Sequence, residues 1–121
     1  MKRLLICVAA LMLPNAGHAA DSAAQQAVNA AAFYMATAYS CPDDPDAYER
    51  AIKAAPDTLA AGGMTAAKAS AWLVSARASI ESEPPADVTS QLCTWLLGNI
   101  EAHLPETRAK LRAASTKESA R

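Results

Sequence analysis

Residues 22–42 read SAAQQAVNAAAFYMATAYSCP, and this stretch decides the fold class of the chain. Ser22 followed three residues later by Gln25 is typical of a capping box, in which two side chains satisfy free backbone amides at a helix start. Apolar residues then recur three or four positions apart, and Pro42 ends the pattern. The stretch therefore predicts a helix that buries one face. The positions on that face are Val28, Ala31, Met35 and Ala38.

Three further helical segments follow, separated by proline and glycine. We expect Asp44 to cap the second segment and Pro56 to end or kink it. We expect a helix stop at Gly62-Gly63. Thr65 then caps the third segment, which ends at Pro84-Pro85. The fourth segment runs from about Asp87 to Leu104. The expected inward residues are Tyr48, Ala51, Ile52 and Ala55, then Ala69, Trp72, Leu73, Ala76 and Ile80, then Leu92, Cys93, Leu96, Ile100 and Leu104.

The fold class predicted from these segments is all-α. No stretch alternates with the period of two that a half-buried strand requires, and alanine, the best helix former, dominates every segment. Short connections favour a compact antiparallel four-helix bundle. We expect one helical domain over residues 20–107, followed by a polar, basic tail over residues 108–121 that frays.

The first nineteen residues are typical of a secretory signal peptide. Lys2 and Arg3 precede an apolar run from Leu4 to Leu13, and small residues lead to a cleavage site after Ala19. As a helix this run would cover about half of the ~30 Å hydrocarbon core, so a membrane span is not expected. Loss of Lys2 and Arg3 would change the net charge from −1 to −3. The short signal indicates a bacterial, periplasmic protein.

Cys41 and Cys93 remain after that cleavage, in an oxidising compartment. We interpret them as one disulfide, which would offset a small core of mostly alanine. A redox-active thiol pair would lack the CxxC spacing, and unpaired cysteines are the other alternative.

Residues that could carry chemistry are few, and we predict no enzyme, no cofactor and no metal. His103 would be the only histidine left after cleavage, and nothing around it resembles a catalytic triad or a zinc site. The acidic run from Asp43 to Asp46 lacks the glycine and glutamate of a calcium loop. Glu81 and Glu83 fall on different helix faces. The near-neutral charge gives no basic patch for nucleic acid, and no small-molecule substrate is expected.

Six aromatic residues would remain after cleavage, more than four narrow helices need for a core. An apolar groove that accepts a helix of a protein partner is the functional interpretation, and plain core packing is the alternative. The residues suggested for such a groove are Tyr34, Trp72, Trp95 and Leu97.

The order of cysteines and helix breaks resembles the PulS/OutS-type pilotins of type II secretion. The residues that carry the resemblance are Phe33, Tyr34, Cys41, Pro42 to Asp46, Gly62-Gly63, Pro84-Pro85 and Cys93. The resemblance implies a small four-helix periplasmic protein with one such disulfide, which grips a C-terminal segment of a secretin. Those pilotins are lipoproteins, whereas this chain has no cysteine directly after its predicted signal peptide.

Two other classes of small exported helical proteins stay open. One is a periplasmic immunity or inhibitor protein that blocks a toxin. The other is an acid-stress chaperone resembling HdeA, for which we would expect carboxylates at a dimer interface. The charges in this sequence fall mostly at predicted helix caps and turns.

Overall fold

The structure is a computed structural model, and it describes residues 22–120. The predicted signal peptide, residues 1–19, lies outside the described residues, so its cleavage stays a prediction. The described part is all-α, and its helices are α2 (Ala23–Tyr39), α3 (Ala47–Ala61), α4 (Ala66–Glu81) and α5 (Ser90–Ser119).

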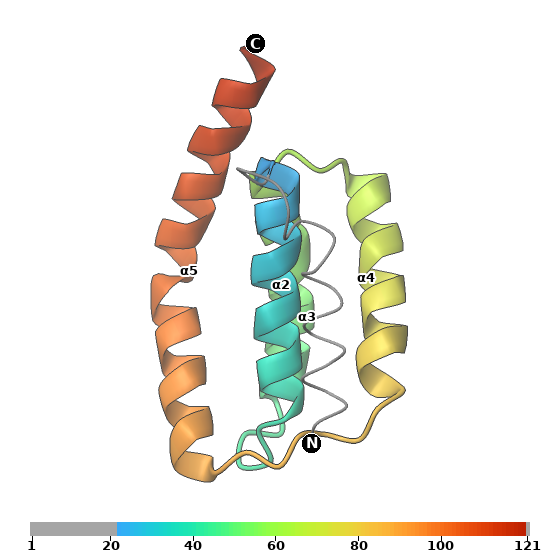
Figure 1. The fold of residues 1–121 in the computed structure, drawn as a ribbon, viewed down its shortest axis with the longest axis vertical. Coiled ribbons are helices and arrows are strands. Elements are labelled where there is room, and N and C mark those ends of the chain that lie inside the picture. Colours follow the sequence, from blue (N-terminus) through green and yellow to red (C-terminus); the bar gives the residue numbers. More distant parts are fainter. Residues whose placement is uncertain (1–21, 121) are drawn as a thin grey trace.

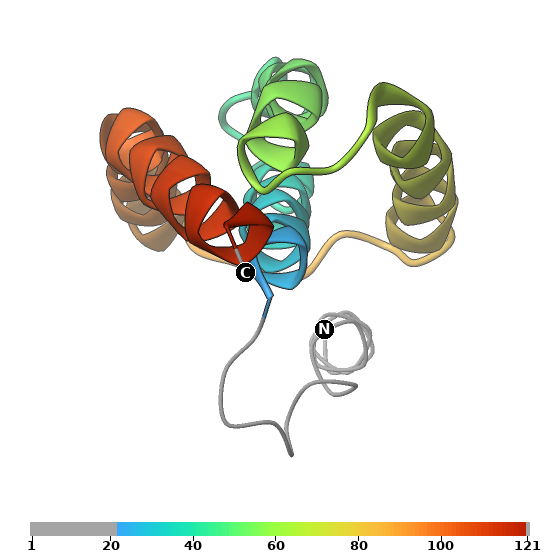
Figure 2. The same ribbon diagram turned by 90° about the horizontal axis from the view of Figure 1, so that it is seen from above.

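The four helices run alternately up and down, with α2 and α3 packed as a central antiparallel pair (Figure 1). Helix α5 covers one side of this pair and α4 covers the other (Figure 2). Helices α4 and α5 make no contact with each other. The predicted antiparallel four-helix bundle is confirmed, and so is the disulfide, which joins Cys41 after α2 to Cys93 in the first turn of α5.

Hydroxyl side chains begin three of the helices. Ser22, Thr65 and Thr89 each accept a hydrogen bond from the backbone N–H three residues ahead, which satisfies an amide without a partner in the helix. Helix α5 therefore starts at Ser90, a few residues after the predicted start. At α2 the serine half of the expected capping box forms, and the Gln25 side-chain N–H donates to the Asn29 side chain at 3.0 Å.

The start of α3 differs from the prediction, because its N-cap is Asp46 rather than Asp44. The Asp46 side chain makes no capping bond. The Asp44 carboxylate instead receives the Arg50 guanidinium and interacts with the backbone amides of Asp46 and Ala47. An acidic residue thus stabilises this helix start from two positions further back.

Helix α3 continues through Pro56 to Ala61 and then stops at the two glycines. Gly63 has a φ of 91°, in the left-handed region that favours glycine. Its N–H donates to the Ala60 carbonyl, and the Met64 N–H donates to the Leu59 carbonyl, which is the Schellman pattern. The predicted stop at Gly62-Gly63 is confirmed.

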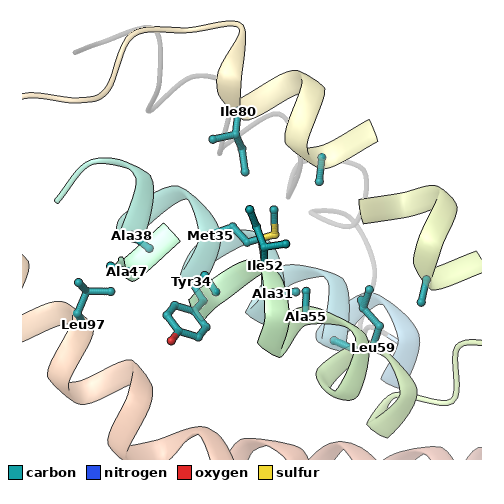
Figure 3. Packing of buried hydrophobic residues seen from close by; sticks show 14 of the residues in the cluster. Ala31, Tyr34, Met35, Ala38, Ala47, Ile52, Ala55, Leu59, Ile80 and Leu97 are labelled. Carbon is teal, nitrogen blue, oxygen red and sulfur yellow. The ribbon is translucent and has the colours of Figure 1, made fainter. Parts of the chain in front are cut away.

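Alanine forms most of the core between α2 and α3, and only a few large side chains fill it (Figure 3). Met35, Leu59 and Thr58 are the largest side chains that are fully buried. In α5 the prediction was wrong at Leu92, which is exposed, while Leu97 is buried in its place. The disulfide holds Cys93 inward, and Leu97 lies only about 40° from it around the helix, whereas Leu92 lies about 100° away.

The residues expected to form a frayed tail continue α5 as far as Ser119, which corrects the predicted boundary at residue 108 (Figure 1). Leu111 is buried, and the Arg108 guanidinium donates to the Ala54 carbonyl and the Thr58 hydroxyl. At the end of the helix, the Glu118 carboxylate accepts the Ala23 N–H at 2.8 Å. These contacts bind the basic segment to the domain.

Candidate functional site

The first turns of α5 are held rigidly against the rest of the domain. Cys93 is bonded to Cys41, and Thr89 caps the helix through the Leu92 N–H. The preceding linker is also fixed, because the Ala86 N–H donates to the Ser40 hydroxyl. Side chains on this part of α5 are therefore presented from a fixed backbone.

Two large apolar side chains on these turns point away from the core. Trp95 is 62% exposed and Leu92 is 47% exposed. Trp95 follows Cys93 by two residues, which places it about 200° around the helix and so on the outward side. With Thr89 and Gln91 the two side chains line a shallow hollow of about 350 Å³. Leu92 and Trp95 are called the aromatic patch below.

A second hollow, of about 360 Å³, lies beside the disulfide. Carboxylates and the backbone of α5 line it, together with one buried leucine. The lining residues are Cys41, Asp43, Asp44, Cys93, Thr94, Leu97, Gly98 and Glu101. A Cβ atom at Gly98 would have no heavy atom within 4 Å, so no described contact requires glycine there. Gly98 leaves the helix backbone open to close approach.

One guanidinium joins three elements at the edge of this hollow. Arg50 of α3 donates to both carboxylate oxygens of Asp44 at 3.1 and 2.7 Å and to those of Glu101 in α5 at 2.9 and 3.3 Å. Tyr34 of α2 donates its hydroxyl to Glu101 as well. This group, called the Arg50 cluster below, ties α5 to both central helices.

The Arg50 cluster changes the acidity of its members. The Arg50 guanidinium lowers the pKa of Glu101 and of Asp44, because it donates hydrogen bonds to their charged forms. Burial, and then the bond to Glu101, raises the pKa of Tyr34 to about 12. Both carboxylates are therefore ionised at neutral pH and the tyrosine is neutral.

A matching group ties α4 to α3. The Tyr48 hydroxyl donates to Glu81 at 2.7 Å, and Arg77 donates to the same carboxylate oxygen at 3.2 Å. These bonds, first that of Tyr48, lower the pKa of Glu81. Burial and then the bond to Glu81 raise the pKa of Tyr48. Each flanking helix is thus attached to the central pair through a glutamate that accepts from a tyrosine and an arginine.

The four residues suggested for a partner groove do not come together. Tyr34 and Leu97 are buried in the core, and Tyr34 is a member of the Arg50 cluster. Trp72 is half-buried on α4, and Trp95 is exposed on α5, on the other side of the central pair. Of the four, Trp95 is the side chain that a partner can reach most directly.

The sequence interpretation missed Leu92, Gly98 and the pairing of Arg50 with Glu101. Leu92 could have been found, because its angle from the disulfide residue Cys93 places it off the inward face. Arg50 and Glu101 lie 51 residues apart, and no local pattern in the sequence predicts a contact over that distance.

Within residues 22–120, no three His, Cys, Asp or Glu side chains are grouped so that they could hold a metal ion. His103 is exposed, and its ring Nδ1 bonds the Asn99 carbonyl at 2.8 Å. None of the described helices is both long enough and apolar enough to cross a membrane.

Compared with protein-family models, with curated proteins and with solved structures, this chain matches none.

Proposed function

We propose that the chain is a periplasmic, non-enzymatic binding protein that holds a helical segment of a partner protein, similar to a secretin pilotin. The observation that carries the proposal is the aromatic patch, two large apolar side chains exposed on a helix start that the disulfide fixes in place. Tryptophan is enriched among the residues that contribute most to protein interfaces.

The rigid backbone under the patch favours binding. A partner loses less free energy when the surface that it meets is already ordered, and this helix start is capped and covalently attached. The Trp95 side chain can bury on the order of 150–250 Å² when it is covered.

The shape of the surface favours a helix as the bound segment. Both hollows lie along the first turns of α5, and Thr94 and Gly98 line the one beside the disulfide. A helix that lies along α5 could place its side chains in both hollows, because the glycine lets the two backbones approach.

Affinity capture tests the proposal. The oxidised chain from residue 20 onward is used as bait in periplasmic and envelope extracts of the source organism at neutral pH, with mass spectrometry as the readout. A captured protein is then cut into synthetic segments, and the affinity of each is measured. We expect one segment that becomes helical on binding, and its affinity should fall by about thirtyfold with Trp95→Ala, a loss of about 2 kcal/mol.

The matched control is Val74→Ala, since Val74 is an equally exposed apolar residue, 68% accessible, on α4. It should leave the affinity unchanged. Binding that Trp95→Ala does not weaken would exclude the aromatic patch as the contact surface. A secretin as the captured protein would support the pilotin-like function, and a toxin would indicate an immunity protein instead.

A second candidate function, an acid-stress chaperone, is favoured by the two tyrosine–glutamate–arginine groups. Glu101 accepts from Arg50 of α3 and Glu81 accepts from Tyr48 of α3, and both bonds are stronger while the glutamates are ionised. Protonation would weaken both attachments and expose apolar surface. If mild acid captures many unrelated proteins and neutral pH captures none, this candidate replaces the pilotin-like function.

A further inference from the structure

The outward face of α5 is uncovered over the whole length of the helix. It carries one large side chain near its beginning and small residues after it, at helical spacing. The exposed residues along this face are Trp95, Gly98, Ala102, Ala109 and Ala113, with the polar Asn99, Glu106 and Lys117 among them. The end of α5 also projects past the other helices, so nothing in the described domain blocks this face (Figure 1).

Charge is divided between the two ends of this face. Beside its beginning lie Asp43, Asp44 and Glu101, and Arg50 pairs with the last two of these. In the last third of α5, exposed Lys117 lies on this face, and exposed Arg112 flanks it about 100° around the helix from Ala113. Neither side chain forms an ion pair within the described range, and Glu118 is the one exposed acidic residue at this end. One end is therefore acidic and the other basic.

We propose that this face pairs with the same face of a second copy of the chain, with the two α5 helices antiparallel. An antiparallel pair places the acidic end of each copy against the basic end of the other, whereas a parallel pair would bring like charges together. In a two-fold arrangement the charges at both ends of the face find opposite charges, because each contact occurs twice. This self-complementarity identifies a second copy as the occupant.

Side-chain size agrees with the same pairing. When the helices cross near the middle of the face, Trp95 of one copy lies opposite Ala113 of the other. A large residue then meets a small one at both ends, and the alanines and Gly98 let the backbones approach to about 8–10 Å. The same register brings Arg112 of one copy beside the hollow that Asp43 lines in the other.

Sedimentation equilibrium of the oxidised chain from residue 20 onward tests the inference over a range of concentrations. We expect a monomer–dimer equilibrium that weakens as salt is added, because exposed charges are screened. Trp95→Ala, Arg112→Glu and Asp43→Arg should each weaken the dimer by about tenfold or more, since each change acts twice in a two-fold pair.

Mixing the two charge variants separates a specific contact from a general effect. In a mixed dimer of Arg112→Glu with Asp43→Arg, both contacts again join opposite charges, so dimerisation should return close to that of the unmodified chain. The control Lys53→Glu alters the net charge as much as Arg112→Glu does, but on α3, and it should have no such effect.

A chain that stays monomeric at every concentration overturns the inference. So does a dimer that Trp95→Ala or Arg112→Glu leaves intact, or a mixture of the charge variants that fails to associate. The second copy would cover the same Trp95 surface as the partner segment proposed above, so the two would compete. Because only this chain is present, sedimentation tests the pair by itself. Circular dichroism of each variant shows whether it is folded.

Discussion

Two glycines of this chain lie in opposite surroundings. A Cβ atom at Gly62 would come within 2.5 Å of the Ala27 Cβ and 2.7 Å of the Ala23 carbonyl oxygen. A Cβ atom at Gly98 would meet nothing within 4 Å. Packing inside the domain therefore requires the first glycine and does not require the second.

Gly62→Ala should lower the free energy of unfolding by about 1–3 kcal/mol, because the added methyl group forces the end of α3 away from the start of α2. Urea unfolding followed by circular dichroism measures this loss. A variant as stable as the unmodified chain would show that the two helices are not in such close contact.

Gly98→Ala should have the opposite effect and raise the free energy of unfolding by about 0.5–1 kcal/mol, because alanine favours the helix interior. The same methyl group covers backbone that lines the hollow beside the disulfide. We expect this variant to bind the partner segment more weakly even though it is more stable. Urea unfolding and an affinity measurement on the same preparation test both effects, and a loss of stability would contradict the open surroundings of Gly98.

At the level of single residues, the sequence predicted the disulfide pair, and the positions that it placed inward are buried or half-buried, with Leu92 as the exception. It could not predict which charges meet, because Arg50 and Glu101 come together only through the packing of α3 against α5. The exposed position of Trp95 was within reach of the sequence, since Cys93 fixes the rotation of α5.

Helix α5 is the element that departs most from its prediction. Its last third is polar and basic, and Leu111 is its only large apolar residue. Leu111 follows Leu104 by seven residues, two helical turns, and so lies on the same face. The seven-residue spacing from Leu104 to Leu111 was the signal that the helix continues. The polar and basic composition around Leu111 favoured a frayed tail instead.

Leu111→Ala should lower the free energy of unfolding by about 2 kcal/mol, at the lower end for a buried leucine because the site is at the edge of the core. The exposed neighbour Lys110 provides the control, and Lys110→Ala should change stability by no more than about 0.5 kcal/mol. Thermal and urea unfolding measure both. Equal, small effects would mean that this end of α5 frays, as its composition suggests.

For the whole molecule, the sequence predicted the fold class and the antiparallel order of the helices. It did not predict that α4 and α5 lie on opposite sides of the central pair. Periodicity shows that a helix has an apolar face, but several helices offer alanine-rich faces that could cover it. Which helix packs on which side of the central pair depends on the few large side chains, on the disulfide, and on Glu81 and Glu101.

Acid should destabilise the whole domain. The pKa values of Asp44, Glu81 and Glu101 are lowered in the folded state, so the unfolded chain takes up protons first as the pH falls. The stabilisation from these groups is complete above their ordinary pKa values of 3.8 for aspartate and 4.5 for glutamate. It is lost as the pH falls through the lowered values.

The urea midpoint should therefore decrease between pH 6 and pH 3, and the double variant Glu81→Gln, Glu101→Gln should flatten that decrease. Glu49→Gln with Glu106→Gln, two exposed glutamates that make neither bridge, gives the matched control. If both double variants follow the same pH profile as the unmodified chain, the bridges do not control acid stability.

The separation of α4 from α5 also determines which contact of the fold is slowest to form. Helices α2, α3 and α4 each pack on a helix next to them in the chain, whereas α5 returns across the molecule to α2 and α3. The contacts of α5 with α2 therefore close the longest loop between helices of this domain, and long loops cost the most entropy to close. The Cys41–Cys93 bond lies within the same loop, so a chain oxidised before it folds begins with the start of α5 already joined to the end of α2.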